Sequence, residues 1–113
     1  MADDCLFCKI AAGKIPAKIA YQDDHLVAFH DINPVSPVHV LIIPRGHAES
    51  VLDVTDPAAM GRLLMAANDL ATQLGIDKTG FRVVTNSGAD AGQTVSHLHF
   101  HLLGGRPFGW PPG

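Results

Sequence analysis

Three of the seven histidines in the chain stand at alternate positions in the segment Ser96 to Gly105, which reads "SHLHFHLLGG". If this segment is a β-strand, His97, His99 and His101 share one face, and the apolar residues between them share the other. Near neutral pH, imidazole can act as a nucleophile, as a general acid or base, or as a donor to phosphate oxygens. The pattern therefore indicates a catalytic site on one face of a strand, with attack on phosphorus as a suitable reaction.

The three histidines have two other possible uses. A single histidine here would be interpreted as a polar surface residue, but three in register favour a shared task. Metal binding is a stronger alternative, because neutral imidazole is the commonest metal ligand. At strand rise, however, the Cα atoms of His97 and His101 lie roughly 13 Å apart, and zinc needs each nitrogen within about 2.1 Å. We expect one ion to bind a single member or a neighbouring pair, and not all three.

Two further sets of residues have side chains that can act in catalysis or bind metal. His39 begins the apolar segment "HVLIIPR" and reaches the same face if that segment is a strand beside the histidines, so we interpret it as an orienting group for His99. Cys5 and Cys8 stand in C-x-x-C order, which in a reducing compartment indicates a metal site or a redox pair more than a structural disulfide. The redox motif normally lies between a strand and a helix, a context that this segment lacks. Two inert buried thiols are the third possibility.

The elements that must position these residues follow from the periodicity. Strands are predicted by alternation or apolar runs at residues 19–24, 25–31, 39–45, 81–86 and 95–103, the first two forming a hairpin around two aspartates. A long helix is predicted between Asp56, a cap with Pro57 at the first turn, and Gly75, and a short N-terminal helix over residues 6–12. This order predicts an α+β fold with an antiparallel five-stranded sheet, covered on one face by the long helix. The other face stays available for chemistry.

Composition limits the classes of protein that fit. The 113 residues suit one domain, 1–113, and 47% hydrophobic with 17% charged residues indicates a folded soluble protein. The net charge is −3 and the eight lysines and arginines are scattered, which argues against long nucleic acid as a partner. No apolar run approaches the roughly 20 residues of a membrane span, and the start lacks a signal-peptide pattern. We expect a cytoplasmic protein without a membrane partner.

The histidine segment resembles the signature of the histidine triad (HIT) family, His-φ-His-φ-His-φ-φ with φ apolar, because residues 97–103 read "HLHFHLL". The likeness extends across nearly the whole chain. The segments "FCKI", "YQDD", "AFHDINP", "PVHVLIIP", "AGQTVSH" and "LLGGRPFGWPPG" are similar to the Hint branch of that family. The resemblance implies a homodimeric HIT fold and a nucleotide hydrolase or transferase acting at the α-phosphate of a purine nucleoside phosphoramidate or adenylylated amine. The product would be a nucleoside monophosphate, released from a nucleotidyl-histidine intermediate.

The resemblance also assigns roles to individual residues. His99 is the nucleophile, His101 contacts the phosphate and leaving group, His39 orients the triad, and His97 completes the catalytic set. The Asp31 carboxylate suits the vicinal diol of a ribose, because a carboxylate accepts two hydrogen bonds. The implied nucleotide contacts are Phe7 and Ile10 at the base, Asp31 and Ile32 at the ribose, Asn86, Gly92, Gln93 and Thr94 around the phosphate beside His99 and His101, and Trp110 from the tail of the partner.

Some bacterial relatives that carry the C-x-x-C motif resemble proteins with a Cys2His2 zinc site. The resemblance implies Cys5, Cys8, His47 from "IPRGH" and His97 as the ligands here. Four protein ligands leave no open position for water, so such a zinc ion is structural and no cofactor is needed for the chemistry. If His97 binds zinc, it cannot also act as a freely titrating acid.

Two other functions remain open from the sequence. The chain could be a non-catalytic zinc- or nucleotide-binding module that acts through protein partners. It could also hydrolyse dinucleoside polyphosphates, as the fragile-histidine-triad branch does, although the Hint-like tail disfavours this.

Overall fold

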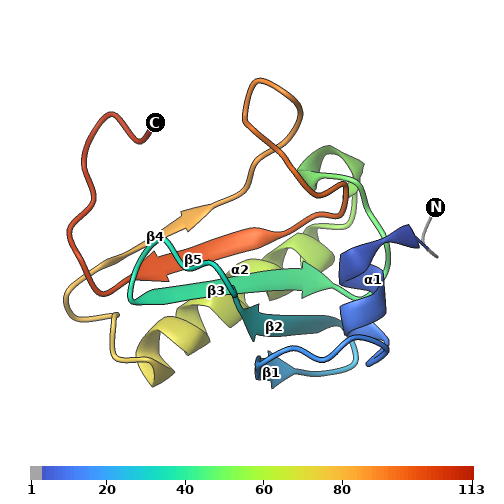
Figure 1. The fold of residues 1–113 in the computed structure, drawn as a ribbon, viewed down its shortest axis with the longest axis horizontal. Coiled ribbons are helices and arrows are strands. Elements are labelled where there is room, and N and C mark those ends of the chain that lie inside the picture. Colours follow the sequence, from blue (N-terminus) through green and yellow to red (C-terminus); the bar gives the residue numbers. More distant parts are fainter. Residues whose placement is uncertain (1–3) are drawn as a thin grey trace.

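The computed structural model describes residues 4–113, which form five strands, two α-helices and a short 3-10 helix. In chain order these are α1 (Leu6–Ala11), β1 (Ile19–Gln22), β2 (Leu26–His30), β3 (Val38–Pro44), η2 (Val51–Asp53), α2 (Pro57–Gln73), β4 (Phe81–Val84) and β5 (Phe100–Gly104). The strands form one antiparallel sheet in the order β1-β2-β3-β5-β4 (Figure 1). The predicted α+β class, with its five-stranded antiparallel sheet, one long helix and short N-terminal helix, is confirmed.

The long helix α2 begins and ends where the sequence predicts. The Asp56 side chain caps it by accepting a hydrogen bond from the Ala58 N–H at 3.0 Å, and Pro57 occupies the first turn, where no N–H is needed. Gly75 follows the helix with φ 76°, a left-handed conformation that favours glycine. Neither helix in residues 4–113 has the length and apolar character that crossing a bilayer requires.

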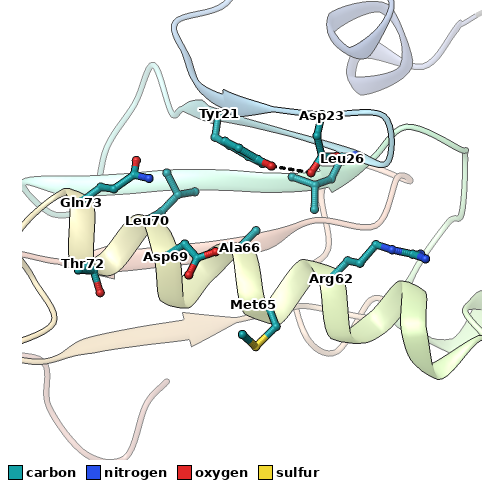
Figure 2. Close-up of a pocket in the computed structure, with 10 residues that line it drawn as sticks. All are labelled: Tyr21, Asp23, Leu26, Arg62, Met65, Ala66, Asp69, Leu70, Thr72 and Gln73. Carbon is teal, nitrogen blue, oxygen red and sulfur yellow. Dashed lines mark hydrogen bonds between the residues drawn. The ribbon is translucent and has the colours of Figure 1, made fainter.

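A cavity of about 490 Å³ opens on the α2 side of the sheet. It is lined by one face of α2 and by the region where β1 turns into β2 (Figure 2). The Tyr21 hydroxyl donates to the Asp23 carboxylate there at 2.7 Å, and Arg62 and Asp69 stand on its helical wall. No residue predicted to bind or act on a substrate lines this cavity.

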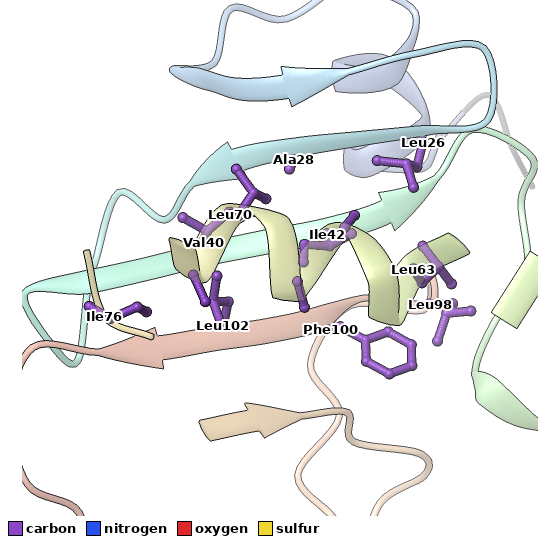
Figure 3. Packing of buried hydrophobic residues seen from close by; sticks show 13 residues of the cluster. Leu26, Ala28, Val40, Ile42, Leu63, Leu70, Ile76, Leu98, Phe100 and Leu102 are labelled. Carbon is purple, nitrogen blue, oxygen red and sulfur yellow. The ribbon is translucent and has the colours of Figure 1, made fainter. Parts of the chain in front are cut away.

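The main hydrophobic core lies between α2 and one face of the sheet (Figure 3). β5 contributes Phe100 and Leu102, and Leu98 precedes them, with exposed fractions of 5%, 0% and 1%. β3 contributes Val40 and Ile42 from alternate positions. The alternation predicted for the histidine segment is therefore confirmed, because its apolar residues pack under α2.

The opposite face of the sheet is not open along its whole length, so the prediction of a free face needs correction. α1 packs on this face and completes a second core made of Phe7, Val27, Phe29, Leu41 and Ile43. The reason lies in the runs "LVAF" and "VLII" of β2 and β3, since strands buried on both faces are continuously apolar. As a result His97 and His99 are buried, with exposed fractions of 0% and 6%.

β5 is shorter than the predicted strand over residues 95–103. It begins at Phe100, so His97 and His99 precede it. The Leu98 N–H donates to the Ala48 carbonyl at 2.6 Å, and this loop contact holds the segment before the strand begins. Extended chain alternates its side chains as a strand does, which is why the pattern predicted the correct faces and the wrong starting residue.

Candidate functional site

His99 lies just before β5, on the face that α1 covers. Its Nδ1 is 2.7 Å from the His97 carbonyl oxygen, and because a carbonyl only accepts, Nδ1 carries the hydrogen. The lone pair of the neutral ring is therefore on Nε2. The Phe7 ring packs edge-on against this imidazole, with centroids 5.1 Å apart and planes at 82°. The backbone and Phe7 together fix the orientation of His99 and select the nitrogen that can attack an electrophile.

A hydrogen-bonded pair of histidines stands beside His99. β3 pairs with β5, and this brings His39 Nε2 within 2.9 Å of His101 Nδ1. The Val35 N–H donates to His39 Nδ1 at 3.1 Å, so the neutral His39 ring carries its hydrogen on Nε2 and donates it to His101. The hydrogen of His101 is then on its own Nε2. We predicted that His39 orients the central His99, and its direct partner is instead His101.

Burial favours the neutral form of this pair. It lowers the pKa of His101 from 6.5 to about 4, with further lowering from the neighbouring His99 and His39. Burial also lowers the pKa of His39, and the Asp31 carboxylate offsets part of that effect. The ring centroids of His99 and His101 are 5.0 Å apart. The lone pair of His99 and the N–H donor of His101 are therefore on neighbouring rings.

Asp31, predicted to contact a ribose, lies directly after β2 and next to the histidine pair. Its Oδ2 is 3.4 Å from His39 Nε2, and its Oδ1 accepts a hydrogen bond from the Asn33 N–H at 2.8 Å. The neighbouring Ile32 side chain is 91% exposed, so it is available to a ligand. The structure therefore places the predicted ribose contact beside the His39–His101 pair.

Two sulfur and two nitrogen atoms meet on the other side of His99. The sulfurs of Cys5 and Cys8 lie 3.2 and 3.4 Å from His97 Nδ1, and Cys8 Sγ lies 3.3 Å from His47 Nδ1. The four ligand atoms lie within 4.8 Å of one another. Tetrahedral zinc, with sulfur at about 2.3 Å and nitrogen at about 2.0 Å, holds neighbouring ligand atoms about 3.3–3.8 Å apart. The four residues predicted as zinc ligands therefore fit a tetrahedral cation.

His97 is oriented for metal binding. Its Nε2–H donates to the Pro44 carbonyl at 3.1 Å, which leaves the lone pair on Nδ1, toward the two thiols. Burial, together with the Cys5 thiol beside it, raises the pKa of Cys8 to about 11. A reactive redox thiol needs a lowered pKa, so the structure favours a metal site over a redox pair. Cation binding there would displace the thiol protons.

The loop between β4 and β5, predicted to bind phosphate, is held together by Gln93. Its amide nitrogen donates to the carbonyls of Glu49 at 2.6 Å and Val95 at 3.0 Å, and its amide oxygen accepts from the Gly88 N–H at 2.9 Å. Gly92 has φ 79°, a left-handed conformation that favours glycine, and its N–H donates to a carbonyl within the loop. These groups are engaged by the protein and shape the loop.

The other predicted nucleotide contacts include Ile10, Thr94 and Asn86. Ile10 lines a cavity of about 370 Å³ with side chains of α1 and the segment that follows it. Thr94 lines a cavity of about 330 Å³ together with Cys5 and His47, beside the candidate metal ligands. Asn86 is half-buried shortly after β4. The cavity at Ile10 and the cavity at Thr94 share no lining residue.

The C-terminal tail leaves β5 at the end of the sheet away from α1 (Figure 1). An arginine pair that the sequence did not single out holds it. Arg82 donates to the Gly109 carbonyl at 2.9 Å, and the guanidinium groups of Arg82 and Arg106 lie 5.2 and 4.4 Å from the centroid of the Phe108 ring. Trp110 is 84% exposed, so within one chain it does not join the buried histidines.

Comparison with known proteins agrees with this geometry. The family model of the HIT domain matches residues 12–108. An uncharacterized HIT-like protein of Synechocystis sp. is 52% identical over 115 aligned positions, which cover 100% of both chains. The purine nucleoside phosphoramidase of Escherichia coli K12 is 45% identical over 111 positions, covering 96% of this chain and 93% of that protein. A solved HIT family hydrolase from Legionella pneumophila superposes with a TM-score of 0.95 at 46% identity, covering 97% of this chain and 100% of that one.

Proposed function

The chain belongs to the HIT domain family, and from that premise we propose that it is a purine nucleoside phosphoramidase of the Hint branch. The HIT family hydrolase and the phosphoramidase among its relatives support a nucleotide hydrolase in general terms. The observation that carries the specific reaction is the hydrogen bonding of two neighbouring rings. The contact of His99 Nδ1 with the His97 carbonyl assigns the His99 lone pair to Nε2, and the contact of His101 Nδ1 with His39 Nε2 assigns the His101 hydrogen to Nε2.

In the first half of the proposed reaction, His99 Nε2 attacks the α-phosphorus of a nucleoside phosphoramidate. The P–N bond to His99 forms while the P–N bond to the leaving amine breaks, and the amine departs with that electron pair and one added proton. An amine leaves poorly until it is protonated, so it needs a proton donor. In the substrate complex His101 is the imidazolium; it gives its Nε2 proton to the amine and becomes neutral. The His97 carbonyl stabilises the charged His99 ring by accepting its Nδ1–H.

In the second half, water attacks the phosphorus of the nucleotidyl-histidine intermediate. The P–N bond to His99 breaks, and the nucleoside monophosphate is released. The water gives up one proton, which returns to His101, so the proton consumed in the first half is recovered. One phosphoramidate and one water thus yield a nucleoside monophosphate and an amine, and His101 serves first as acid and then as base.

The nucleotide is assigned to the surface around these histidines. A carboxylate such as Asp31 can accept hydrogen bonds from both ribose hydroxyls. A glycine-containing loop lets backbone and hydroxyl donors approach a phosphate. The proposed contacts are Phe7 and Ile10 for the base, Asp31 and Ile32 for the ribose, and Asn86, Gly92, Gln93 and Thr94 for the loop that receives the phosphate.

We propose that Cys5, Cys8, His47 and His97 hold a structural zinc ion. The spacing of their ligand atoms and the tautomer of His97 support this assignment. When bound, zinc with four protein ligands has no open position for water and serves to cross-link α1 to the segment before β5. The catalytic roles therefore stay with His99 and His101.

A homodimer in the cytoplasm completes the proposal. The two cysteines form no disulfide, as a reducing compartment favours. β4 is an edge strand of the sheet, and Trp110 is exposed in the tail beyond β5. In a Hint-like dimer this tail would reach the neighbouring active site, so that each chain supplies Trp110 to its partner.

Replacement of the nucleophile tests the reaction. His99→Ala is expected to lower kcat for an adenosine phosphoramidate by about 10⁴-fold or more, while calorimetry still detects nucleotide binding. His25→Ala, at an exposed histidine between β1 and β2, is the matched control and keeps full turnover. Undiminished turnover in His99→Ala would contradict the mechanism.

A non-catalytic zinc- or nucleotide-binding module is the second candidate. It is favoured by the separation of the four candidate metal ligands from the His39–His101 pair, because the two groups lie on different sides of His99. Such a module binds metal and nucleotide stoichiometrically, and the pure wild-type protein turns over neither phosphoramidate nor dinucleoside polyphosphate. Assaying these two substrates side by side also separates the phosphoramidase from a dinucleoside polyphosphate hydrolase.

A further inference from the structure

We infer that Asp31 is a positioning residue for proton transfer, acting as the counter-ion of the His39–His101 pair in addition to its contact with the ribose. This inference rests on the proposed function, because the proposed cycle requires His101 to deliver one proton and to recover it. It gives Asp31 a task that does not depend on the ribose.

The hydrogen bonds of the pair leave no place for an additional proton. His39 Nδ1 accepts from the Val35 N–H, His39 Nε2 carries a hydrogen, and His101 Nδ1 accepts that hydrogen at 2.9 Å. The fourth nitrogen, His101 Nε2, already carries its own hydrogen. If His101 gains a proton on Nδ1, two N–H groups face each other. The N–H of His39 must then find a different acceptor.

Asp31 provides that acceptor. Its Oδ2 lies 3.4 Å from His39 Nε2, and Asp31, His39 and His101 offer polar atoms that lie within 4.8 Å of one another. The Asn33 N–H holds the other carboxylate oxygen at 2.8 Å, which keeps the group in place. A separation of 3.4 Å is longer than an ordinary hydrogen bond. It becomes a charge-assisted contact once the pair gains a proton.

The charges around His101 favour the same role. The groups that act on it electrostatically are His99 and His39, which disfavour its protonated form, and Asp31, which favours it. The side chains of Asp31 and His39 are 21% and 5% exposed, so water screens their contact only in part. A bound substrate phosphate adds a second negative charge beside His101. Carboxylate and phosphate together allow His101 to hold the proton that the amine takes.

A role in ribose binding alone makes a different prediction. In that case Asp31 contributes nothing to a substrate that lacks ribose hydroxyls, and removing its charge leaves the turnover of such a substrate unchanged. The counter-ion role acts on His101 and therefore on kcat, whichever sugar is bound. A substrate with a dideoxyribose separates the two.

The test compares Asp31→Asn with the wild type on adenosine phosphoramidate and on its dideoxyadenosine analogue. Asn keeps the shape of the side chain and removes its charge. We expect kcat to fall about tenfold or more on both substrates, with KM raised only on the ribose substrate. Asp24→Asn, at an exposed aspartate between β1 and β2, is the control and leaves both parameters unchanged. Equal kcat for wild type and Asp31→Asn on the dideoxy substrate would overturn the inference.

A second measurement needs no turnover. Nitrogen NMR of the histidine side chains at about pH 5 follows the protonated fraction of His101. This fraction is expected to fall several-fold in Asp31→Asn and to stay constant in Asp24→Asn. An unchanged fraction in Asp31→Asn would overturn the inference even in an active enzyme. If instead the wild type hydrolyses no phosphoramidate, the proposed function fails, and this titration still decides whether Asp31 acts on His101.

Discussion

His97 and His101 are the two neighbours of His99 at the same spacing along the chain, and the structure gives them opposite environments. The Nε2 of His97 donates to the Pro44 carbonyl, and its Nδ1 faces two thiols. The Nδ1 of His101 accepts a hydrogen bond from His39, which leaves the hydrogen on Nε2. His97 is therefore prepared to bind a cation, and His101 is prepared to donate to an anion.

The difference shows that residue type and spacing do not decide what a histidine does. The partner of one ring nitrogen determines whether the other nitrogen carries a lone pair or a hydrogen. For His97 that partner is a carbonyl, and for His101 it is another imidazole. We call Cys5, Cys8, His47 and His97 the metal side of His99, and the His39–His101 pair its proton side. A substitution can disrupt one side and leave the other intact.

The largest effect is expected on the metal side. In a Cys5→Ser, Cys8→Ser double variant, the set loses both thiolates, and bound zinc falls from one per chain to none. The free energy of unfolding falls by about 4 kcal/mol or more when metal is present at a thousandfold excess over its Kd. Metal analysis and chemical denaturation measure the two effects, with His25→Ala as the control. Equal zinc content in the double variant and the wild type would show that the cluster holds no ion.

The next effect belongs to the proton side. His101→Gln keeps a polar side chain and removes the acid, so kcat for a phosphoramidate should fall by a factor of about 10² to 10⁴. Zinc content stays at the wild-type value, because His101 is not one of the metal ligands. Steady-state kinetics and metal analysis on the same preparation check both statements. Loss of zinc in His101→Gln would mean that the two sides are not independent.

A smaller effect is expected in the pH dependence of stability. The pKa of His101 is about 4 in the fold and 6.5 without it, so between these values the unfolded chain binds more protons. The stability that neutral His101 contributes is thus complete above pH 6.5 and is lost as the pH falls toward 4. Urea denaturation across this range should show a steeper loss in the wild type than in His101→Gln. Parallel curves would contradict the burial of a neutral ring at this position.

The sequence predicted the parts of this site that depend on side-chain type. Alternation placed Leu98 under α2 and His99 on the opposite face, and the family resemblance selected Cys5, Cys8, His47 and His97, whose ligand atoms the structure brings together. These features are visible because an apolar side chain and a thiol differ in kind from their neighbours.

The sequence could not predict the groups that set the tautomers. The Val35 N–H and the carbonyls of His97 and Pro44 are backbone atoms, which every residue type supplies, so no letter in the sequence marks them. The same limit applies to His39, because its predicted role in orienting the triad did not specify which ring it contacts. Predicting the face of a strand requires only its period, whereas predicting a hydrogen-bond partner requires the register between strands.

The exposed tail has a practical consequence for spectroscopy. Trp110 is the sole tryptophan among the 113 residues, and it is 84% exposed. Indole fluorescence moves to shorter wavelength when the ring leaves water, so the tryptophan emission of the unlabelled protein reports the environment of the tail. A dilution series in a fluorimeter can therefore follow docking of the tail on a second chain, and the buried histidines need not be altered to observe it.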